Sequence, residues 1–431
     1  MKLARLAAAL SLVVPSLTFA QGNDPRLEDA RKKMAAGDPD GALAAVEVAV
    51  ANHPDLPPAQ LLFARLLFQN RQMAAGRAVM ERAAVERPDH PEVYSSFGRL
   101  ALAEGRLLDA SLAFERATTL AASDRWPAPQ QRIWLNSAHA GAAAVAERRK
   151  DWKNAYASLS VLAEFNPGDA ITRYRLGRAS FFLDKVEEAD SLLRSAHKEN
   201  PRLEPPDVTF GELWWQKGDA DKAERYFNAA LTKHPSDPRA RHALTRFLIH
   251  LGRGEAARDS ASKGLSLQPK DLEARMLLVL ASRQAGDVPA AEAVLASWLA
   301  DDSSNPIALS QAAQLAAQSK DPAKKAKALE RANAAAMALQ GRGEAQTTIG
   351  VVQFLLGNVA EAEKILRAAM VSGDAYADTA YYLALILEQK GDRDGAIRLF
   401  SRAIDAPGLF IHGNDAQARR DKLRAAVQTK P

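Results

Sequence analysis

The sequence predicts an all-α fold, an α–α superhelix of about eleven helix–turn–helix repeats. Small residues recur at a nearly constant spacing, as at Ala155, Ala189 and Ala223, and the segments between them have the apolar pattern of amphipathic helices. A glycine separates the two helices of most repeats, and a proline follows the second helix of many. No stretch alternates apolar and polar residues as a strand would. These patterns indicate thin layers of paired helices rather than one thick core.

The segment 91–122 shows the repeating unit clearly, as two amphipathic helices joined by a turn at Gly105. Gly98 and Ala110 let these helices approach closely because neither is bulky, and Phe114 fills the space beside them. Residues equivalent to Ala110 recur along the chain at Ala42, Gly76, Ala155, Ala189, Ala223, Ala257, Ala291, Ala362 and Ala396. Turn glycines recur at Gly37, Gly218, Gly252, Gly286, Gly357 and Gly391, and prolines at Pro54, Pro88, Pro167, Pro201, Pro235 and Pro269.

The period of ~34 residues and these landmarks together resemble the tetratricopeptide repeat (TPR) family, over roughly residues 23–405. The resemblance implies a TPR solenoid that serves as a non-catalytic scaffold and binds protein or peptide segments in its concave groove. Members of the family in the bacterial envelope serve pilus assembly, outer-membrane insertion, secretion and polysaccharide export. The lysine and asparagine clamp with which some members hold a terminal carboxylate is not matched here, so a chaperone tail is not the expected ligand.

Three parts are predicted along the chain: a signal peptide at 1–20, the repeat array at 21–408, and a C-terminal capping helix and tail at 409–431. The first part has a charged start, an apolar run and a small-x-small cleavage site ending at Ala20. A short membrane anchor is the alternative, although the apolar run is shorter than the ~20 residues of a spanning helix. We expect an exported protein, in the periplasm, with no stable membrane insertion after cleavage.

The array has two predicted irregularities. An insertion at 123–135 contains Trp126 and precedes a long helix that begins near Gln130, and Trp126 and Trp134 either face the groove or cover a neighbouring repeat. The repeat at about 306–340 has Lys325 where the others have alanine, so it is expected to be irregular. Just before it, Trp298 is expected to fill the space that an alanine-rich helix leaves.

Composition and motifs exclude several classes of function. The net charge of +5 comes from nearly balanced acidic and basic residues, which argues against nucleic acid as a partner. The absence of cysteine excludes disulfides and a cysteine-linked lipid anchor. No phosphate loop, HExxH or Gly-x-Ser-x-Gly motif is present, and His242 and His250 stand ~12 Å apart on one helix, too far to share a metal ion. We therefore expect that the protein is not an enzyme and that it has no cofactor and no metal site.

The candidate ligand groove follows from the register of the family. Its predicted residues are Arg65, Arg99, Tyr174, Arg178, Phe181, Trp215, His242, Arg246 and His250. The four arginines occupy the ninth position of a first helix, where a guanidinium can hold a carboxylate through forked hydrogen bonds. Each can instead pair with a glutamate of a neighbouring repeat, such as Glu212. A polysaccharide stacked on the aromatic rings is the alternative ligand, within an exopolysaccharide synthesis or export system.

Overall fold

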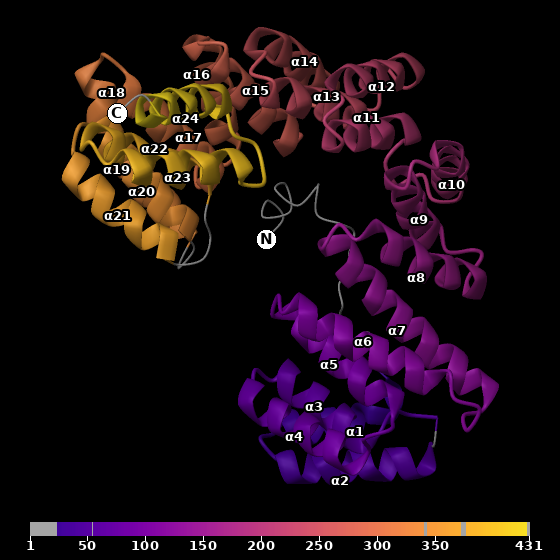
Figure 1. The fold of residues 1–431 in the computed structure, drawn as a ribbon. Coiled ribbons are helices and arrows are strands. Elements are labelled where there is room, and N and C mark those ends of the chain that lie inside the picture. Colours follow the sequence, from indigo (N-terminus) through magenta and orange to yellow (C-terminus); the bar gives the residue numbers. More distant parts are fainter. Residues whose placement is uncertain (1–23, 54, 340–342, 372–375, 429–431) are drawn as a thin grey trace. The chain divides into compact units, whose positions relative to one another are not determined.

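The computed structural model describes residues 24–53, 55–339, 343–371 and 376–428 (Figure 1). Every regular element in these ranges is helical, which confirms the all-α prediction. None of the helices within them has the length and apolar character needed to cross a membrane. Residues 1–20, the predicted signal peptide, lie outside the described residues, so that assignment stays a prediction.

The described chain divides into two compact units at residue 206, which we call the N-terminal unit and the C-terminal unit. The helices of the N-terminal unit are η1 (Pro25–Leu27), α1 (Glu28–Ala35), α2 (Pro39–Asn52), α3 (Ala59–Gln69), α4 (Met73–Glu86), α5 (Pro91–Ala103), α6 (Leu107–Ala121), α7 (Ala128–Arg148), α8 (Trp152–Phe165), α9 (Ala170–Phe182) and α10 (Val186–Glu199). Those of the C-terminal unit are α11 (Pro206–Gln216), α12 (Ala220–Lys233), α13 (Pro238–His250), α14 (Gly254–Leu267), α15 (Leu272–Gln284), α16 (Val288–Asp301), α17 (Pro306–Gln318), α18 (Pro322–Ala326), α19 (Ala328–Ala338), α20 (Gly343–Leu355), α21 (Val359–Val371), α22 (Ala377–Gln389), α23 (Arg393–Asp405) and α24 (Gly413–Gln428).

Helices pack in consecutive pairs, for example α5 with α6, α9 with α10 and α22 with α23 (Figure 1). The recurring small residues lie in these contacts, and Ala110 is fully buried. A Cβ atom added to Gly98 would stand 2.8 Å from the Phe114 ring, and one added to Gly141 would stand 2.1 Å from it. The sequence therefore repeats small residues because a large neighbouring ring occupies the space.

The turn between the paired helices needs a left-handed residue. All seven predicted turn glycines have positive φ, between 72° and 90°. Three other turns place Arg71, Lys150 and Asp184 in the same conformation, with φ between 56° and 62°. Since only glycine adopts this region without a steric penalty, the regular recurrence of glycine has a backbone cause.

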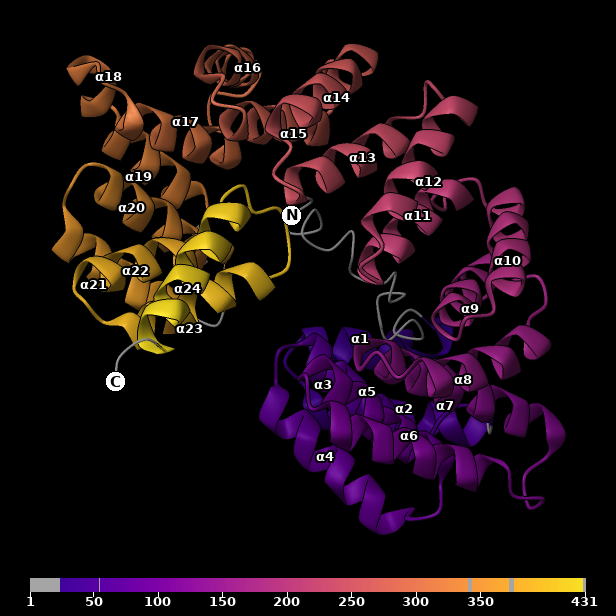
Figure 2. The same ribbon diagram turned by 45° about the horizontal axis from the view of Figure 1, so that its top comes forward.

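First helices form the inner wall within each unit. Contacts join α5 with α7 in the N-terminal unit, and α13 with α15, α17 with α20 and α20 with α22 in the C-terminal unit. Successive second helices make no comparable contact within the described ranges. Figure 2 shows α13 and α15 side by side in this way. A side chain on the inner side of a first helix therefore faces the concave surface of its unit.

The helices depart from the regular pattern at two places, after residue 123 and after α16. Helix α7 runs for 21 residues, against 11 to 13 for α3, α5 and α9. The repeat after α16 has its second helix broken into α18 and α19. Trp298 is fully buried against Ala308 and Ala312 of α17, so it fills the space that these alanines leave.

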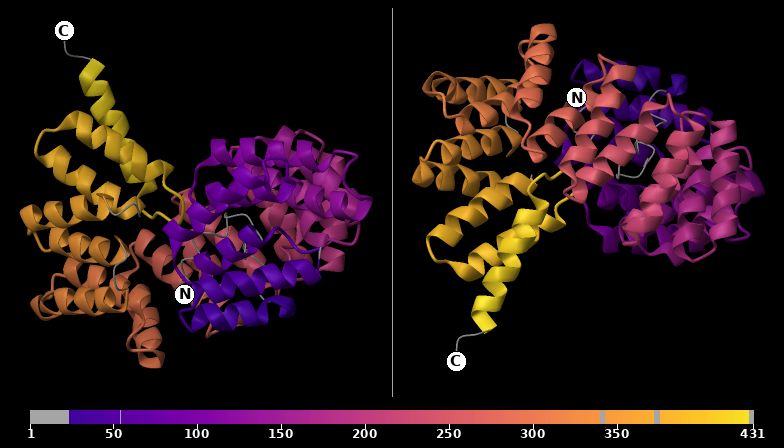
Figure 3. Two further views of the ribbon diagram at one scale, coloured as in Figure 1. Left: turned by 90° about the horizontal axis from the view of Figure 1, so that it is seen from below. Right: turned by 90° about the horizontal axis from the view of Figure 1, so that it is seen from above.

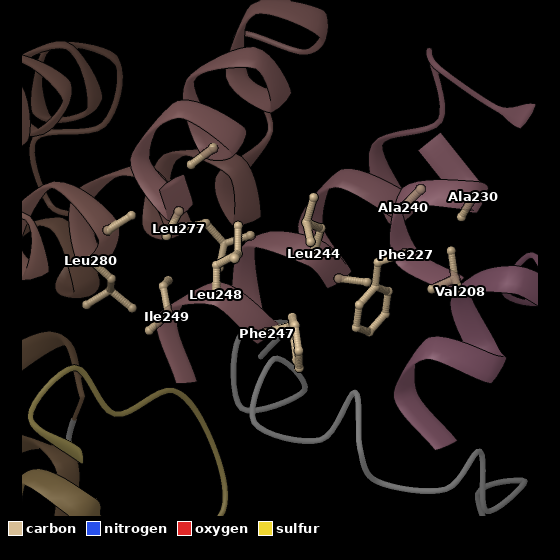
Figure 4. Packing of buried hydrophobic residues seen from close by; sticks show 14 of the residues in the cluster. Val208, Phe227, Ala230, Ala240, Leu244, Phe247, Leu248, Ile249, Leu277 and Leu280 are labelled. Atoms are coloured by element: carbon tan, nitrogen blue, oxygen red, sulfur yellow. The ribbon is translucent and has the colours of Figure 1, made fainter. Parts of the chain in front are cut away.

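A large apolar core joins α11 to α15 in the C-terminal unit. Figure 4 shows part of it, with Val208 and Ala230 at one end, Phe247 in the middle, and Ile249 near Leu280 at the other end. Leu409 and Ile411 also pack against this core, although they follow α23. The core of α11–α15 is therefore partly covered by the far end of the same unit.

Candidate functional site

A cavity of about 880 Å³ lies in the N-terminal unit, against the consecutive first helices α3, α5 and α7. We call it the inner pocket, and its central lining residues are Arg65, His90, Glu92, Arg99, Trp126, Trp134 and Ser137. Because α7 is longer than the other first helices, its extra turns carry Trp134 and Ser137 to the pocket. The insertion before α7 supplies Trp126, and Pro127 caps the helix in an extended conformation.

Arg65, Glu92 and Arg99 form a buried charged cluster in this pocket. One oxygen of Glu92, Oε1, accepts hydrogen bonds from Arg65 Nη2 at 2.5 Å and from Arg99 Nη2 at 2.6 Å. Arg99 also donates to Ser96 Oγ at 2.8 Å and to Ser137 Oγ at 2.9 Å, so it joins α5 to α7. The side chains of Arg65, Glu92 and Arg99 are only 9%, 8% and 14% exposed. The two arginines are therefore held in position by one carboxylate.

The pKa values in this cluster reflect burial opposed by charge. Burial raises the pKa of Glu92, but the charges of Arg99 and Arg65 outweigh it, and the net shift is downward. Burial lowers the pKa of Arg65, while Glu92 acts in the opposite direction. Burial also lowers the pKa of His90, so its imidazole is neutral at pH 7. The cluster thus has two cations and one anion in a poorly hydrated place.

An aromatic group forms the other side of the pocket. The rings of Trp126 and Trp134 meet edge to face with centroids 4.7 Å apart, and His90 packs edge-on against both, at 5.5 and 4.9 Å. Trp126 Nε1 donates to the carbonyl of Leu120 at 3.0 Å, and the Arg125 guanidinium lies 4.6 Å from the Trp126 ring. His90 Nδ1 accepts from the backbone N–H of Glu92, which caps α5. Both alternatives for the tryptophans therefore hold, because they cover the preceding repeat and also line the pocket.

The pocket lining has balanced charge. Its acidic side chains are Asp24, Glu47, Asp55 and Glu92, and its basic side chains are Arg26, Arg65, Arg87 and Arg99. Apolar residues such as Leu56 and Ile133 stand among them, and Ile133 is 60% exposed. Such a lining suits a ligand with apolar groups and charges of both signs, and gives no preference for a polyanion.

The predicted groove residues of α9 have three different environments. Phe181 is fully buried, with its ring edge-on to Phe182 at 5.5 Å, and so has no surface to offer a ligand. Tyr174 is half-buried and packs against the small cluster around Ala196. Arg178 is half-buried and makes no hydrogen bond or ion pair to any residue that the structure describes. Helix α9 therefore presents a guanidinium that is not used within the described fold.

The predicted residues of the C-terminal unit lie on α11 and α13. Arg246 bridges two glutamates, with Nη1 2.5 Å from Glu273 Oε1 and Nη2 3.2 Å from Glu212 Oε1. His242 is 5% exposed and its Nδ1 stands 3.6 Å from Glu273 Oε2. Pairing with Glu212, the alternative for an arginine at this position, is thus confirmed for Arg246. Both residues hold first helices together.

Trp215 and His250 form a separate aromatic pair in the C-terminal unit. Their rings meet edge-on with centroids 5.0 Å apart, and Trp215 also packs against Phe247 at 5.6 Å. His250 is exposed, whereas Trp215 is half-buried against the core of α11–α15. The structure therefore does not place this pair in the inner pocket, which belongs to the N-terminal unit.

Sequence reasoning missed Glu92 and Glu273, the carboxylates that hold Arg65 and Arg246. A signal for them is present, because each glutamate follows its arginine by 27 residues and stands near the start of the next first helix. The residue 27 positions after Arg178 is Pro205, which cannot form an ion pair with an arginine. Within the described ranges, no group of three or more histidine or acidic side chains could hold a metal ion.

Comparisons with known proteins point to one family. Family models described as "Tetratricopeptide repeat" match residues 33–100, 215–279 and 350–409. No curated protein sequence matches the chain. Similar solved structures include yeast Tom70, 14% identical over 93% of this chain and 96% of its own, with a TM-score of 0.41. A tetratricopeptide repeat protein from Parabacteroides merdae is 14% identical over 67% of this chain and 99% of its own, with a TM-score of 0.38. YrrB, a TPR protein with an unusual peptide-binding site, is 15% identical over 54% of this chain and 96% of its own, with a TM-score of 0.34.

Proposed function

This chain belongs to the tetratricopeptide repeat family of protein-interaction scaffolds, and from that premise we propose that it is a non-catalytic adaptor whose inner pocket binds a segment of a partner protein. The observation that carries the proposal is the pairing of two half-buried tryptophans with a fixed arginine cluster in one cavity on the inner wall. Tryptophan and arginine are the side chains that most often dominate protein interfaces.

The chemistry of the pocket fits a polypeptide. The faces of Trp126 and Trp134 offer flat apolar contact, while Arg99 is fixed by Ser96, Ser137 and Glu92 and can meet a carbonyl or carboxylate without losing side-chain freedom. The balanced charge of the lining suits a segment that carries both signs. His90 is not available as a base, because its Nδ1 lone pair accepts the backbone N–H of Glu92 and the proton of the neutral ring lies on Nε2.

Replacing Trp134 by alanine is expected to weaken partner binding at least about tenfold, because a tryptophan at the centre of an interface contributes about 2 kcal/mol or more. The measurement is affinity capture from envelope extract with the chain from Gln21 as bait, followed by titration of the captured partner. Trp152→Ala is the matched control, since Trp152 stacks on Phe182 at 4.2 Å and does not line the pocket. Equal capture by both variants would contradict a role for the inner pocket.

A carbohydrate is the second candidate ligand, and the Trp126–Trp134 pair is the observation that favours it, because sugar rings stack on such surfaces. Affinity capture, repeated in moderate salt, distinguishes a sugar polymer from a charged peptide. A sugar polymer held by stacking stays bound in moderate salt, whereas a charged peptide is released.

We also propose that the protein works in the bacterial cell envelope, most simply in the periplasm. Support comes from the charged and apolar pattern of residues 1–20. The expected result of cell fractionation is a chain that starts near Gln21 in the periplasmic fraction. A chain with an intact N-terminus in the cytoplasm would contradict this part of the proposal.

A further inference from the structure

The segment 122–127 brings Trp126 to the inner pocket, although the segment belongs to no helix. It connects α6 to α7, which lie side by side in the N-terminal unit (Figure 3, purple ribbons). Side chains on connecting segments are held less precisely than those on helices. The contacts that this segment makes with its neighbours therefore decide how firmly the Trp126 ring is held.

Arg125 ties the segment to the turn before α5. Its Nη1 donates to Asp89 Oδ2 at 2.5 Å, and its Nη2 donates to the backbone carbonyl of Asp89. The same guanidinium lies over the Trp126 ring, with its central carbon 4.6 Å from the ring centroid. Because a guanidinium is planar and its donors have a fixed geometry, one side chain both anchors the segment and orients the ring.

The short stretch 89–92 joins this anchor to the rest of the pocket. Asp89 holds Arg125. The next residue, His90, packs against both tryptophans, and Glu92 binds both arginines of the charged cluster. The aromatic group and the charged cluster are therefore positioned from one stretch of backbone, and Arg125 connects the insertion to it.

The Arg125–Asp89 pair lies outside the cavity. Neither side chain lines the inner pocket, and they are 39% and 58% exposed. Ion pairs this exposed contribute little to the stability of a fold, so loss of the pair should not unfold its repeat. An effect of the pair on binding would therefore act through the position of Trp126.

We propose that Arg125 and Asp89 are positioning residues of the inner pocket, which hold the Trp126 ring in place before a partner binds. This inference rests on the function proposed for the pocket. A ring that is already fixed loses less conformational entropy when a ligand covers it, so the ligand binds more tightly.

The first test needs no partner. The full chain is labelled with fluorotryptophan, and the fluorine resonance of Trp126 is identified by its loss in Trp126→Phe. We expect Arg125→Ala to shift and broaden this resonance, because the guanidinium leaves the ring and the segment is no longer anchored. Asp89→Ala should broaden it as well. The double variant should show no more change than Arg125→Ala, since the two residues act together.

Arg106→Ala is the matched control. Arg106 is 45% exposed and pairs with two carboxylates, those of Glu104 and Asp109, but it does not line the pocket. Its loss should leave the Trp126 resonance and partner binding unchanged.

The second test is titration of the partner captured by the native chain. We expect Arg125→Ala and Asp89→Ala each to weaken binding about three- to tenfold, which corresponds to the cost of ordering one side chain. Their melting temperatures should stay at the native value. Arg125→Lys keeps the charge but not the forked donors, so it should restore only part of the affinity.

An unchanged Trp126 resonance in Arg125→Ala would overturn the proposal. Native affinity of Arg125→Ala and Asp89→Ala would also overturn it, if Trp134→Ala weakens binding in the same assay. Should Trp134→Ala bind normally too, the function proposed for the pocket fails, and the fluorine spectra still decide whether Arg125 fixes Trp126. Circular dichroism first shows that each variant folds, and Arg125→Lys takes the place of Arg125→Ala in both tests if the alanine variant does not.

Discussion

Replacing Glu92 by glutamine is expected to destabilise the repeats around α3 and α5 by about 3–5 kcal/mol, the usual cost of removing one partner from a buried ion pair. Glu92 is the shared acceptor of Arg65 and Arg99, and the charged atoms of both arginines are poorly exposed. Without the carboxylate, two buried cations face each other with no counter-charge. Because a repeat array need not unfold in one step, the loss is measured by hydrogen exchange of α3 and α5 in urea.

Glu104→Gln is the matched control for this change. Glu104 also meets an arginine 27 residues away, Arg77, but that pair lies at the surface, so its loss should cost at most about 1 kcal/mol. The pKa of Glu92 is below its ordinary value of 4.5, so its contribution is complete above pH 4.5 and is lost as the pH falls further. The difference between the native chain and Glu92→Gln should therefore shrink in acid. A difference that grows in acid would contradict this account.

Replacing Trp298 by alanine is expected to cost about 3–5 kcal/mol, because a fully buried tryptophan leaves a large cavity. The neighbours cannot refill the space, since Ala308 and Ala312 on the facing helix have no side chain to extend into it. The loss should appear as a lower denaturation midpoint and faster exchange in α16 and α17. Repeats of the N-terminal unit should keep their native exchange rates.

Trp298→Phe keeps an aromatic ring in the space but removes the indole N–H. The indole N–H of Trp298 has no hydrogen-bond partner among the described residues, so phenylalanine also removes a buried unpaired donor. We expect this variant to lose clearly less stability than Trp298→Ala. Equal losses in the two variants would show that the aromatic ring does not fill the space.

The fold could be predicted from the sequence because its cause is local and repeated. Each turn needs a left-handed residue and each helix pair needs a small one, so Gly105 and Ala110 have counterparts in most of the other repeats. The broken second helix at α18 and α19 follows from the same rule, since Pro322 and Lys325 depart from the pattern. Trp298 could be placed for the complementary reason, as a large residue beside unusually small ones.

The site could be predicted only in part, because register along a helix does not specify the partners of a side chain. Arg65 and Arg99 occupy the expected position and line the inner pocket, yet the carboxylate between them comes from the start of α5. The register predicts Phe181 in the groove, but its side chain is fully buried. The contact between Gln284 and Ile411 lies beyond any periodic signal, because these residues are 127 positions apart in the sequence.

The 27-residue spacing between an arginine and its glutamate also bears on how such a gene can change in evolution. Arg246 requires an acidic residue near the start of the next first helix, and Glu273 supplies it. Deletion of the segment 272–305 by unequal recombination would bring Ile307 to that position, and duplication of 238–271 would bring Arg239. The first change removes one of the two carboxylates that hold Arg246, and the second places two cations together. Although the backbone repeats, neighbouring repeats are matched in charge. Recombination near Arg246 can therefore add or remove a repeat only together with compensating substitutions.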